Sequence, residues 1–600
     1  MNQEEKKQYL DGAKKVLDRK RSAIKKEIEI VPQEALKLRE LLHGSQSDII
    51  NYYAMTAIYR KRYNDLLNLH PSPYFNFCLV KFEGEDNFKE LYFSKFSFDA
   101  EEIYSWASPI AQIRFENPGK FIFKNKNGNQ TIEIIKKDQY LIAEGKILFL
   151  STESNDQERE LVYQEYFSTR KTAFILPEIV AQMEKAQDQV VRAQFGGKLA
   201  VTGPAGSGKT TLALHRIAYL LQAPETSDKL DSRDVIVFVQ DESTRDYFSH
   251  LLPELGIKDV EITTLGSWAK KILPIENWNI EEFQKDSDAH YVWAKIQAQK
   301  TSKVVFWKND WFSILTETYG DKLNQAQKKM LMDQKKKKIL DRVDLAILLK
   351  SKIKTDEGIN VEKEYYQVIS KTQELKKKKK KFKVSYKLIL IDEFQNYLSE
   401  HIEIFNQGIN PSGGELIFIG DFNQRVRLGT VNNMLQIDLQ EERLVKLSKV
   451  YRNTKQILMY LNELGYKVDI PQMIKDGPKV QEAVFGGEEE EKFIQEKLKE
   501  LDKVSVGILS HDELLLKNYA QKFDQGNVKV MSLIDAQGVE FDTVFLVGVG
   551  ENLLSVKHLP VELQEEMAKI KRDLLYIALT RAMNELYVIG EKKLSDIVSK

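Results

Sequence analysis

The hydrophobic pattern of residues 1–70 is that of two amphipathic helices. Apolar positions such as Leu10, Val16 and Ile24 recur at near-helical spacing, as they do on one face of a helix. The turn-like segment His43-Gly44-Ser45 interrupts this pattern before a second helical run begins. We therefore expect a helical hairpin, which either projects as a coiled-coil arm or packs against the body of the protein.

The pattern changes between Ser72 and Leu150. Short runs rich in aromatic and β-branched residues alternate there with turn residues, which is typical of β-strands. The segment Lys126-Asn127-Gly128 has the residue types of a hairpin turn. These features predict a small, β-rich module over residues 71–160.

From about Phe174 onwards, apolar strand-like runs alternate with helical stretches, which is the pattern of a parallel α/β sheet. The alternation is lost between about 270 and 385, where we expect a helical insertion. The predicted fold class is α/β, with one α/β domain over 161–430 and a second over 431–600. The strand-like runs are KLAVTG, DVIVFV, VEITTL, KLILIDE, ELIFIGD, VSVGILS, VKVMSL, TVFLVGV and ELYVIG.

Composition narrows the classes of function. Lysine and arginine total 89, as do aspartate and glutamate, so any nucleic-acid contact must come from a local basic patch. The single cysteine, Cys78, excludes an internal disulfide and a thiolate metal cluster. The chain starts without an apolar signal segment and has no apolar run of about 18 residues. We therefore expect a cytoplasmic protein that does not cross a membrane.

The segment from Gly203 to Thr210 carries the clearest chemistry. Its sequence, GPAGSGKT, matches G-x-x-x-x-G-K-[ST] and lies between a strand-like run and a helical run, as phosphate-binding loops do. Such a loop surrounds phosphates with backbone N–H groups, its lysine (Lys209) reaches the β- and γ-phosphates, and its hydroxyl (Thr210) holds Mg²⁺. We expect ATP and Mg²⁺ as cofactors. The expected nucleotide ligands of this segment are Gly203, Gly206, Gly208, Lys209, Thr210 and Thr211.

Two further strand-like runs end in polar residues. LILIDE ends in Asp392 and Glu393, the arrangement of a Walker B element. In such an element, Asp392 holds Mg²⁺ through a water, while Glu393 orients or deprotonates the attacking water. The run ELIFIGD leads to Gln424. Together with the phosphate-binding loop, these segments predict an ATP hydrolase that needs no other small-molecule substrate.

Three boxes nearer the C-terminus complete an ordered set: Tyr451-Arg452-Asn453-Thr454, AQGVEF at 536–541 and LTRA at 579–582. The whole set resembles the motifs of UvrD/Rep-type superfamily 1 helicases over residues 185–590. That resemblance implies two RecA-like P-loop domains that close on one nucleotide.

The resemblance also implies roles for individual residues. Tyr451 would stack on adenine, and Gln424 would sense the γ-phosphate. Arg452 and Arg581 would reach the γ-phosphate from the second domain, and such arginines raise turnover by roughly 10³–10⁵. The remaining implied contacts are Gln187 (with Gln189 as the second choice) at the adenine edge, and Gly538 and Glu540 at the ribose.

Other segments resemble the HelD branch of this family. The run DYFSHLLPELG at 246–256 is similar to a HelD phrase. Segments at 72–75, 104–110 and 136–142 resemble the β module that follows the HelD coiled coil. HelD proteins are ATPases that bind bacterial RNA polymerase, strip nucleic acid from it and recycle it. The resemblance therefore implies RNA polymerase and a DNA or RNA strand as partners.

The alternative is a UvrD-like single-stranded DNA translocase or 3′–5′ helicase in repair or defence. The residues after Gln424, Arg-Val-Arg-Leu-Gly, lack an aromatic side chain that could stack on a DNA base. Only 87 residues separate Arg452 from Glu540, too few for the accessory domain of UvrD. Both features favour a motor that acts on a protein–nucleic-acid assembly.

A local basic block lies just before the Walker B strand. It consists of Lys376–Lys381 together with Lys383. Such a block either contacts a phosphate backbone or forms a solvated loop, and the sequence does not decide between these alternatives.

Overall fold

The computed structural model of the chain forms two compact units. Unit 1 comprises Met1–Ala193, Leu214–Asp231 and His250–Lys258, and unit 2 comprises Gln194–Ala213, Ser232–Ser249 and Asp259–Lys600. The structure describes residues 3–598 except 126–127, 155–184, 205–206, 224–225, 227–229, 256, 282–285, 369–374, 448–452, 471–473 and 502–503.

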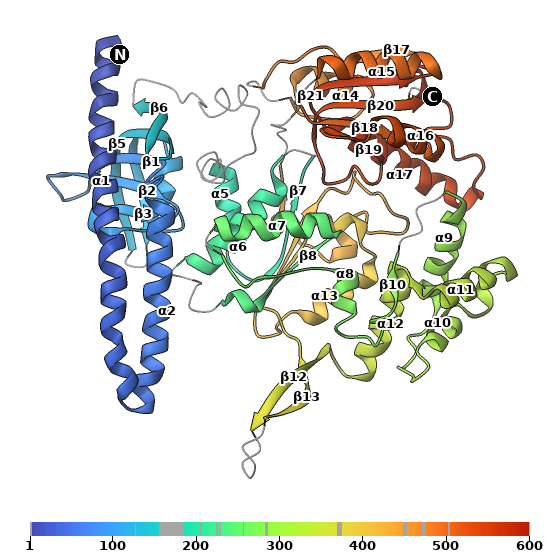
Figure 1. Ribbon diagram of the computed structural model, residues 1–600, viewed down its shortest axis with the longest axis horizontal. Helices are drawn as coiled ribbons and strands as arrows, with labels where there is room; N and C mark the ends of the chain where they lie inside the picture. Colours follow the sequence, from blue (N-terminus) through green and yellow to red (C-terminus); the bar gives the residue numbers. More distant parts are fainter. Residues whose placement is uncertain are drawn as a thin grey trace. The chain divides into compact units, whose positions relative to one another are not determined.

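Unit 1 begins with a helical hairpin (Figure 1). Helix α1 spans Gln3–Lys37, a 3₁₀ turn spans Leu38–His43, and helix α2 spans Gln46–Leu69. Asp48 N–H donates a hydrogen bond to the Ser45 hydroxyl, and Ser45 N–H donates one to the Asp48 carboxylate. This capping box starts α2 at the position where the sequence predicts the turn.

A six-stranded sheet follows the hairpin. Its order is β3-β2-β1-β5-β4, with β6 paired to β5, and all its pairs are antiparallel except β2–β3. Asn125 of β4 lies opposite Gly128 of β5, whereas Lys126 and Asn127 of the predicted turn lie outside the described residues. The strands are β1 (Asn76–Phe82), β2 (Phe88–Ser94), β3 (Ile103–Ser105), β4 (Gly119–Asn125), β5 (Gly128–Ala143) and β6 (Lys146–Ser154).

Helix α1 packs against this sheet through one apolar face. Leu17, Ile24 and Val31 of α1 are at most 2% exposed. They share a hydrophobic core with Tyr74 and with Tyr140 of β5. The base of the hairpin is therefore held to the β module by burial of apolar surface.

The turn end of the hairpin is not covered in this way. Ile50, Tyr53 and Ile58 of α2 are 63%, 65% and 59% exposed. Figure 1 shows this end of α1 and α2 extending past the sheet of unit 1. The hairpin thus combines the two expected arrangements, with a packed base and a projecting end that carries apolar side chains.

Among its described residues, unit 2 contains two large parallel sheets. The first has the order β16-β7-β15-β14-β8-β9. Five of its strands coincide with strand-like runs in the sequence, while the short, partly buried β16 was not predicted. The strands are β7 (Gly197–Thr202), β8 (Val235–Val239), β9 (Glu261–Thr264), β14 (Leu388–Ile391), β15 (Glu415–Gly420) and β16 (Leu444–Lys446).

The second sheet has the order β17-β21-β20-β18-β19 and is also parallel. Four of its strands were predicted, and β17, which has no buried residue, was not. The mixed α/β class is therefore confirmed. The strands are β17 (Gln481–Val484), β18 (Val506–Ser510), β19 (Val528–Ser532), β20 (Phe541–Val549) and β21 (Ala582–Gly590).

Helices connect the parallel strands of both sheets. None of the helices among the described residues is long and apolar enough to span a bilayer. The helices used below are α5 (Lys185–Val191) in unit 1, and α6 (Lys209–Gln222), α7 (Glu242–Glu254), α13 (Ser399–Gly408), α14 (Lys455–Glu463) and α17 (Val561–Thr580).

The predicted insertion is helical only in its first part. Beyond it, β12 (Asn360–Val368) and β13 (Leu375–Lys383) form an antiparallel hairpin, which corrects the expectation of a helical segment up to about 385. A lysine run has no strand preference of its own, so its strand conformation depends on pairing with β12, which carries valine and tyrosine. The helices of the first part are α8 (Leu265–Ala269), α9 (Asp286–Thr301), α10 (Phe312–Tyr319), α11 (Gln325–Lys337) and α12 (Arg342–Thr355).

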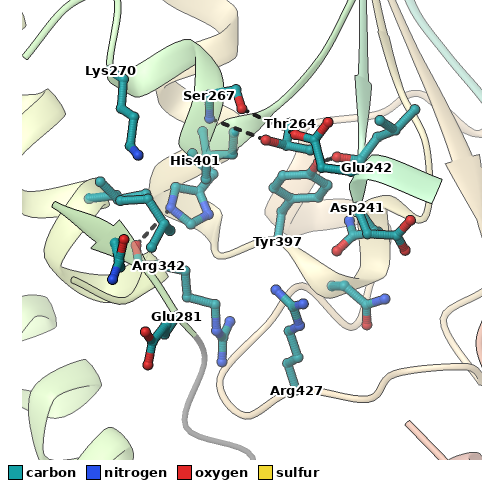
Figure 2. Close-up of a pocket in the computed structure, with 18 residues that line it drawn as sticks. Asp241, Glu242, Thr264, Ser267, Lys270, Glu281, Arg342, Tyr397, His401 and Arg427 are labelled. Carbon is teal, nitrogen blue, oxygen red and sulfur yellow. Dashed lines mark hydrogen bonds between the residues drawn. The ribbon is translucent and has the colours of Figure 1, made fainter. Parts of the chain in front are cut away.

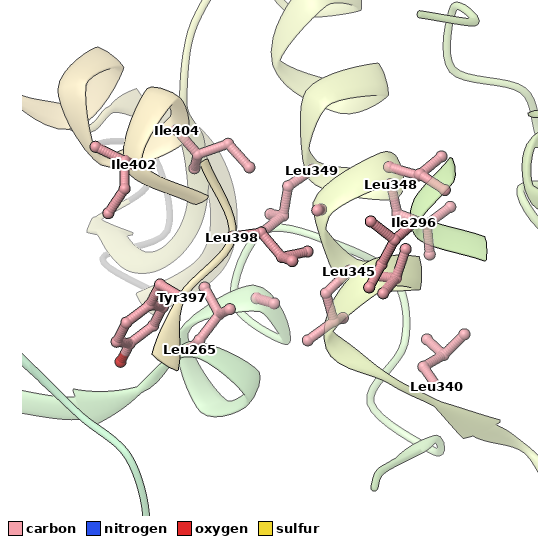
Figure 3. Packing of buried hydrophobic residues seen from close by; sticks show 14 of the residues in the cluster. Leu265, Ile296, Leu340, Leu345, Leu348, Leu349, Tyr397, Leu398, Ile402 and Ile404 are labelled. Atoms are coloured by element: carbon pink, nitrogen blue, oxygen red, sulfur yellow. The ribbon is translucent and has the colours of Figure 1, made fainter. Parts of the chain in front are cut away.

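The helical part shares a core with the first sheet. Figure 3 shows Leu345 and Leu349 of α12 beside Leu398, which lies between β14 and α13. These three side chains are at most 1% exposed. Because Leu398 follows the Walker B segment closely, burial of α12 also fixes the backbone that leaves the site.

Candidate nucleotide-binding site

The phosphate-binding loop joins the buried strand β7 to helix α6. A Cβ atom on Gly203 would lie only 2.4 Å from the Leu447 carbonyl oxygen, so this position has no room for a side chain. Gly208 has a φ of +83°, which favours glycine. Lys209, Thr210 and Thr211 begin α6. Gly206 lies outside the described residues.

The Lys209 ammonium is held at this loop. Its Nζ donates hydrogen bonds to the carbonyl oxygens of Gly203 (2.8 Å) and Pro204 (3.0 Å). Burial lowers the pKa of Lys209, and the Asp392, Glu393 and Asp421 carboxylates oppose this shift. A buried cation therefore faces carboxylates from two neighbouring strands.

The Walker B carboxylates follow the end of β14. Asp392 is 5% exposed, and its N–H donates to the Phe238 carbonyl (2.9 Å) of β8. Burial raises the pKa of Asp392 well above its ordinary value, the Glu393 charge raises it further, and the Lys209 ammonium lowers it. Glu393 has a φ of +48° and a ψ of +45°, a left-handed conformation that is strained for glutamate.

Gln395 links these carboxylates to the end of β15. Its amide nitrogen donates to Glu393 Oε2 (2.5 Å) and to the Gln424 carbonyl (3.2 Å). Its amide oxygen accepts from the Asp421 N–H (3.1 Å), and Gln424 Nε2 donates to Asp421 Oδ2 (2.8 Å). Gln424 is therefore connected to Glu393 through a buried hydrogen-bond network.

Arg581 brings a second cation to the site from the second sheet. It directly follows α17, is 6% exposed, and contributes to the lowered pKa of Lys209. Its guanidinium donates to the carbonyl oxygens of Ile577 (3.1 Å) and Val539 (3.2 Å). Arg581 is thus held by its own helix and by the AQGVEF box.

The AQGVEF box also contacts the first α/β domain. Asn396 Nδ2, three residues after Glu393, donates to Gln537 Oε1 (3.1 Å). Gly538, the next residue, has a φ of +83° and so occupies a glycine-favouring conformation.

Arg425 forms another bridge between the two domains of unit 2. Its N–H donates to Asp573 (3.2 Å), and its Nη1 pairs with Glu566 (3.0 Å), both on α17. Arg425 is 4% exposed, and burial is the main cause that raises the pKa of Asp573 to about 7. The only sign in the sequence that Arg425 belongs to the site is its position directly after Gln424. The sequence does not indicate that Arg425 contacts α17.

The structure brings together Lys209, Asp392, Glu393, Gln424 and Arg581. Tyr451 and Arg452 lie outside the described residues. Gln187 is on α5, which belongs to unit 1. Glu540 lies directly before β20. Gln395 and Arg425 are site residues that the sequence did not single out.

A magnesium ion fits the chemistry of this site. Thr210 offers a hydroxyl and Asp392 a carboxylate, and Mg²⁺ prefers oxygen ligands supplied by one or two side chains, substrate phosphates and waters. Binding of a divalent cation would offset the burial that raises the pKa of Asp392. Among the described residues, no cluster of three or more histidine, cysteine or acidic side chains forms a separate metal cage.

A polar pocket of about 560 Å³ lies beside the Walker B segment. It is formed by the ends of β8 and β9, by α12 and by the backbone that follows Glu393. Figure 2 shows Asp241 and Glu242 on one side of this pocket and Lys270 and Arg342 on the other. Its mixed charge favours polar ligands over apolar ones.

A phosphate-binding loop and an acid pair at the carboxyl edge of a parallel sheet define a P-loop nucleoside triphosphatase. Residues 183–440 match the UvrD/REP helicase N-terminal domain, and residues 488–593 match the UvrD-like helicase C-terminal domain. The chain therefore belongs to the UvrD/REP superfamily 1 helicases, which are ATP-dependent nucleic-acid motors. A comparison with curated proteins found no match.

Proposed function

We propose that this chain is a HelD-like motor that uses ATP hydrolysis to remodel or recycle complexes of RNA polymerase with nucleic acid. Its two parallel sheets are the cores of two RecA-like domains. The observation that carries the proposal is the contact between the two domains beside the Walker B segment, where Asn396 donates to Gln537 and Arg425 pairs with Glu566 of α17.

The loop residues bind and orient the triphosphate. Backbone N–H groups near Gly203 and Gly208 surround the phosphates at the start of α6, where the helix dipole favours negative charge. Lys209 exchanges the Gly203 and Pro204 carbonyls for β- and γ-phosphate oxygens. Thr210 and Asp392 would hold Mg²⁺, which would neutralise charge on the phosphates.

Glu393 orients or deprotonates the attacking water. Gln395 holds the Glu393 carboxylate, and the same amide contacts the backbone of Gln424. A γ-phosphate that engages Gln424 would therefore alter the network that positions Glu393. The position of the Glu393 carboxylate thus depends on whether a γ-phosphate is bound.

Arg581 and Arg452 complete the site from the second domain. Developing charge on the transferred phosphoryl group is stabilised only when these guanidinium groups are close, so turnover requires a closed cleft. Arg425 ties the segment after Gln424 to α17, and Arg581 directly follows that helix. Motion of α17 thus couples the nucleotide state to the position of Arg581.

The helical hairpin of unit 1 supports a polymerase partner. Its projecting end exposes Ile50, Tyr53 and Ile58, and large exposed apolar patches commonly mark protein–protein contacts. Affinity purification of the tagged chain from its native cell tests this assignment. RNA polymerase subunits should co-elute, and co-elution should be lost when Ile50, Tyr53 and Ile58 are replaced by serine. Absence of polymerase subunits in both eluates would contradict the HelD-like role.

The second candidate is a single-stranded DNA translocase. The polar pocket beside the Walker B segment favours it, because this pocket lies at the carboxyl ends of β8 and β9. Single-stranded DNA alone should then stimulate ATP hydrolysis strongly. Stimulation only when RNA polymerase is added would favour the HelD-like function instead.

A further inference from the structure

The β12–β13 hairpin lies far along the first domain from the nucleotide site. It ends at Lys383, just before β14 begins at Leu388, whereas Asp392 follows the other end of that strand. In a parallel sheet these two ends lie at opposite edges. Figure 1 shows the hairpin extending away from the first sheet of unit 2. It is therefore separate from the catalytic residues.

One face of the hairpin has acidic as well as basic positions. The register places Lys379 opposite Glu364 and Lys381 opposite Glu362, and residues directly opposite in an antiparallel pair share a face. Lys381 also pairs with Asp356 (3.7 Å) at the root of the hairpin. We call this side the paired face.

The other face has no acidic position among the described residues of the two strands. The register places Lys380 opposite Lys363 and Lys378 opposite Tyr365. Phe382 continues this face, and the Lys380 ammonium lies 5.5 Å from the centre of its ring. Lys378, Lys380 and Phe382 are exposed. We call this side the basic face.

We propose that the basic face binds the phosphate backbone of a nucleic-acid duplex, independently of ATP. A chain with zero net charge can attract nucleic acid only through such a local concentration of lysines. Same-face lysines recur about every 6.7 Å along a strand, which suits repeated contacts to a regular row of phosphates. A duplex carries the densest such charge, about one per 1.7 Å of axis, and its major groove admits a two-stranded β-ribbon.

The chemistry of the basic face predicts binding without sequence preference. Lysine ammonium groups contact phosphates as point charges, and half of the described positions of this face are lysines. Gln367, opposite Lys376, is the single described position of this face with a residue type that reads base edges in pairs. The hairpin would hold the duplex that flanks the motor while the nucleotide site cycles.

The test compares two double variants with equal loss of charge on the same strand. Lys378→Gln/Lys380→Gln removes lysines from the basic face, and Lys379→Gln/Lys381→Gln removes them from the paired face. Binding of the full chain to a fluorescent 20-base-pair DNA duplex is followed by anisotropy, without ATP, over a range of salt concentrations. The basic-face variant should lose about tenfold in affinity at low salt, and its salt slope should fall by about 1.8. The paired-face variant should stay within about twofold of the parent.

Three outcomes would overturn this proposal. Equal losses in both variants would reduce it to general electrostatics. A loss confined to a single-stranded oligonucleotide would exclude the duplex. Unchanged duplex binding with a loss of binding to polyglutamate would make the hairpin a contact for an acidic protein. ATP hydrolysis without nucleic acid, measured in both variants, should remain at the parental rate, so failure here is distinguishable from failure of the proposed motor function.

Discussion

The nucleotide site and the β12–β13 hairpin use charge in opposite ways. At the nucleotide site, Lys209 and Arg581 are at most 8% exposed, and they share their surroundings with carboxylates. On the hairpin, Lys378 and Lys380 are exposed to solvent. Buried charges depend on particular neighbours, because solvation is lost and pairing must replace it. Exposed charges act together and respond mainly to salt.

The largest expected effect comes from removing the Arg581 guanidinium from the buried charges of the nucleotide site. Arg581→Ala should lower turnover by about 10³-fold or more, because the transition state loses a guanidinium, while the dissociation constant for ATP changes little. Steady-state hydrolysis and nucleotide-binding measurements check this. Lys569→Ala on the exposed side of α17 is the matched control and should leave turnover unchanged. Normal turnover in Arg581→Ala would show that Arg581 does not take part in hydrolysis.

Glu393→Gln should have the next largest effect. Loss of the carboxylate removes the group that accepts a proton from water, so turnover should fall by about 10²–10⁴-fold. Binding of ATP should persist, since the loop and Lys209 are intact. Glu400→Gln, a partly exposed position at the start of α13, is the control. Equal rates in the two variants would assign the base elsewhere.

Arg425→Ala tests whether α17 is coupled to the end of β15. We expect turnover to fall by roughly tenfold with ATP binding retained, because Glu566 and Asp573 lose their partner and α17 is less well positioned. Combination with Glu566→Ala should add little further loss. Fully additive effects on turnover would show that the bridge does not act as a unit.

The smallest expected effect is a pH dependence at Asp573. Its pKa in the folded protein is about 7, above the ordinary value of 3.8, because the carboxyl is buried. The contribution of its protonated form to stability is complete below pH 4 and is lost as the pH rises towards 7. Chemical unfolding of Asp573→Asn should therefore show a smaller loss of stability between pH 5 and 7 than the parent. Parallel pH profiles of the two proteins would contradict this assignment.

Local patterns in the sequence were sufficient to predict most strands of the two large parallel sheets and the phosphate-binding loop. Strands such as β8 and β14 are fully buried apolar runs, and GPAGSGKT carries its own structural signature. The positions of Gln395, Arg425 and Gln537 follow instead from how the two sheets meet, and no periodic pattern encodes such contacts.

The strand conformation of the lysine run was not predicted, for a different reason. Lys376–Lys381 has neither alternating hydrophobicity nor a strand-forming composition, so the residue pattern of this segment alone does not predict β13. Only its register with β12 reveals that the lysines divide into a paired and a basic face. The functional distinction between neighbouring lysines is therefore a property of the fold.

The most direct test of the account is whether the two domains meet around the nucleotide. Cysteines at Asn396 and Gln537, whose side chains lie 3.1 Å apart, can be joined by a short bis-maleimide, because the only native cysteine, Cys78, is buried. We predict rapid cross-linking with a non-hydrolysable ATP analogue and Mg²⁺, slower cross-linking without nucleotide, and none in either single-cysteine variant. Equal cross-linking rates with and without nucleotide would contradict closure of the domains on ATP.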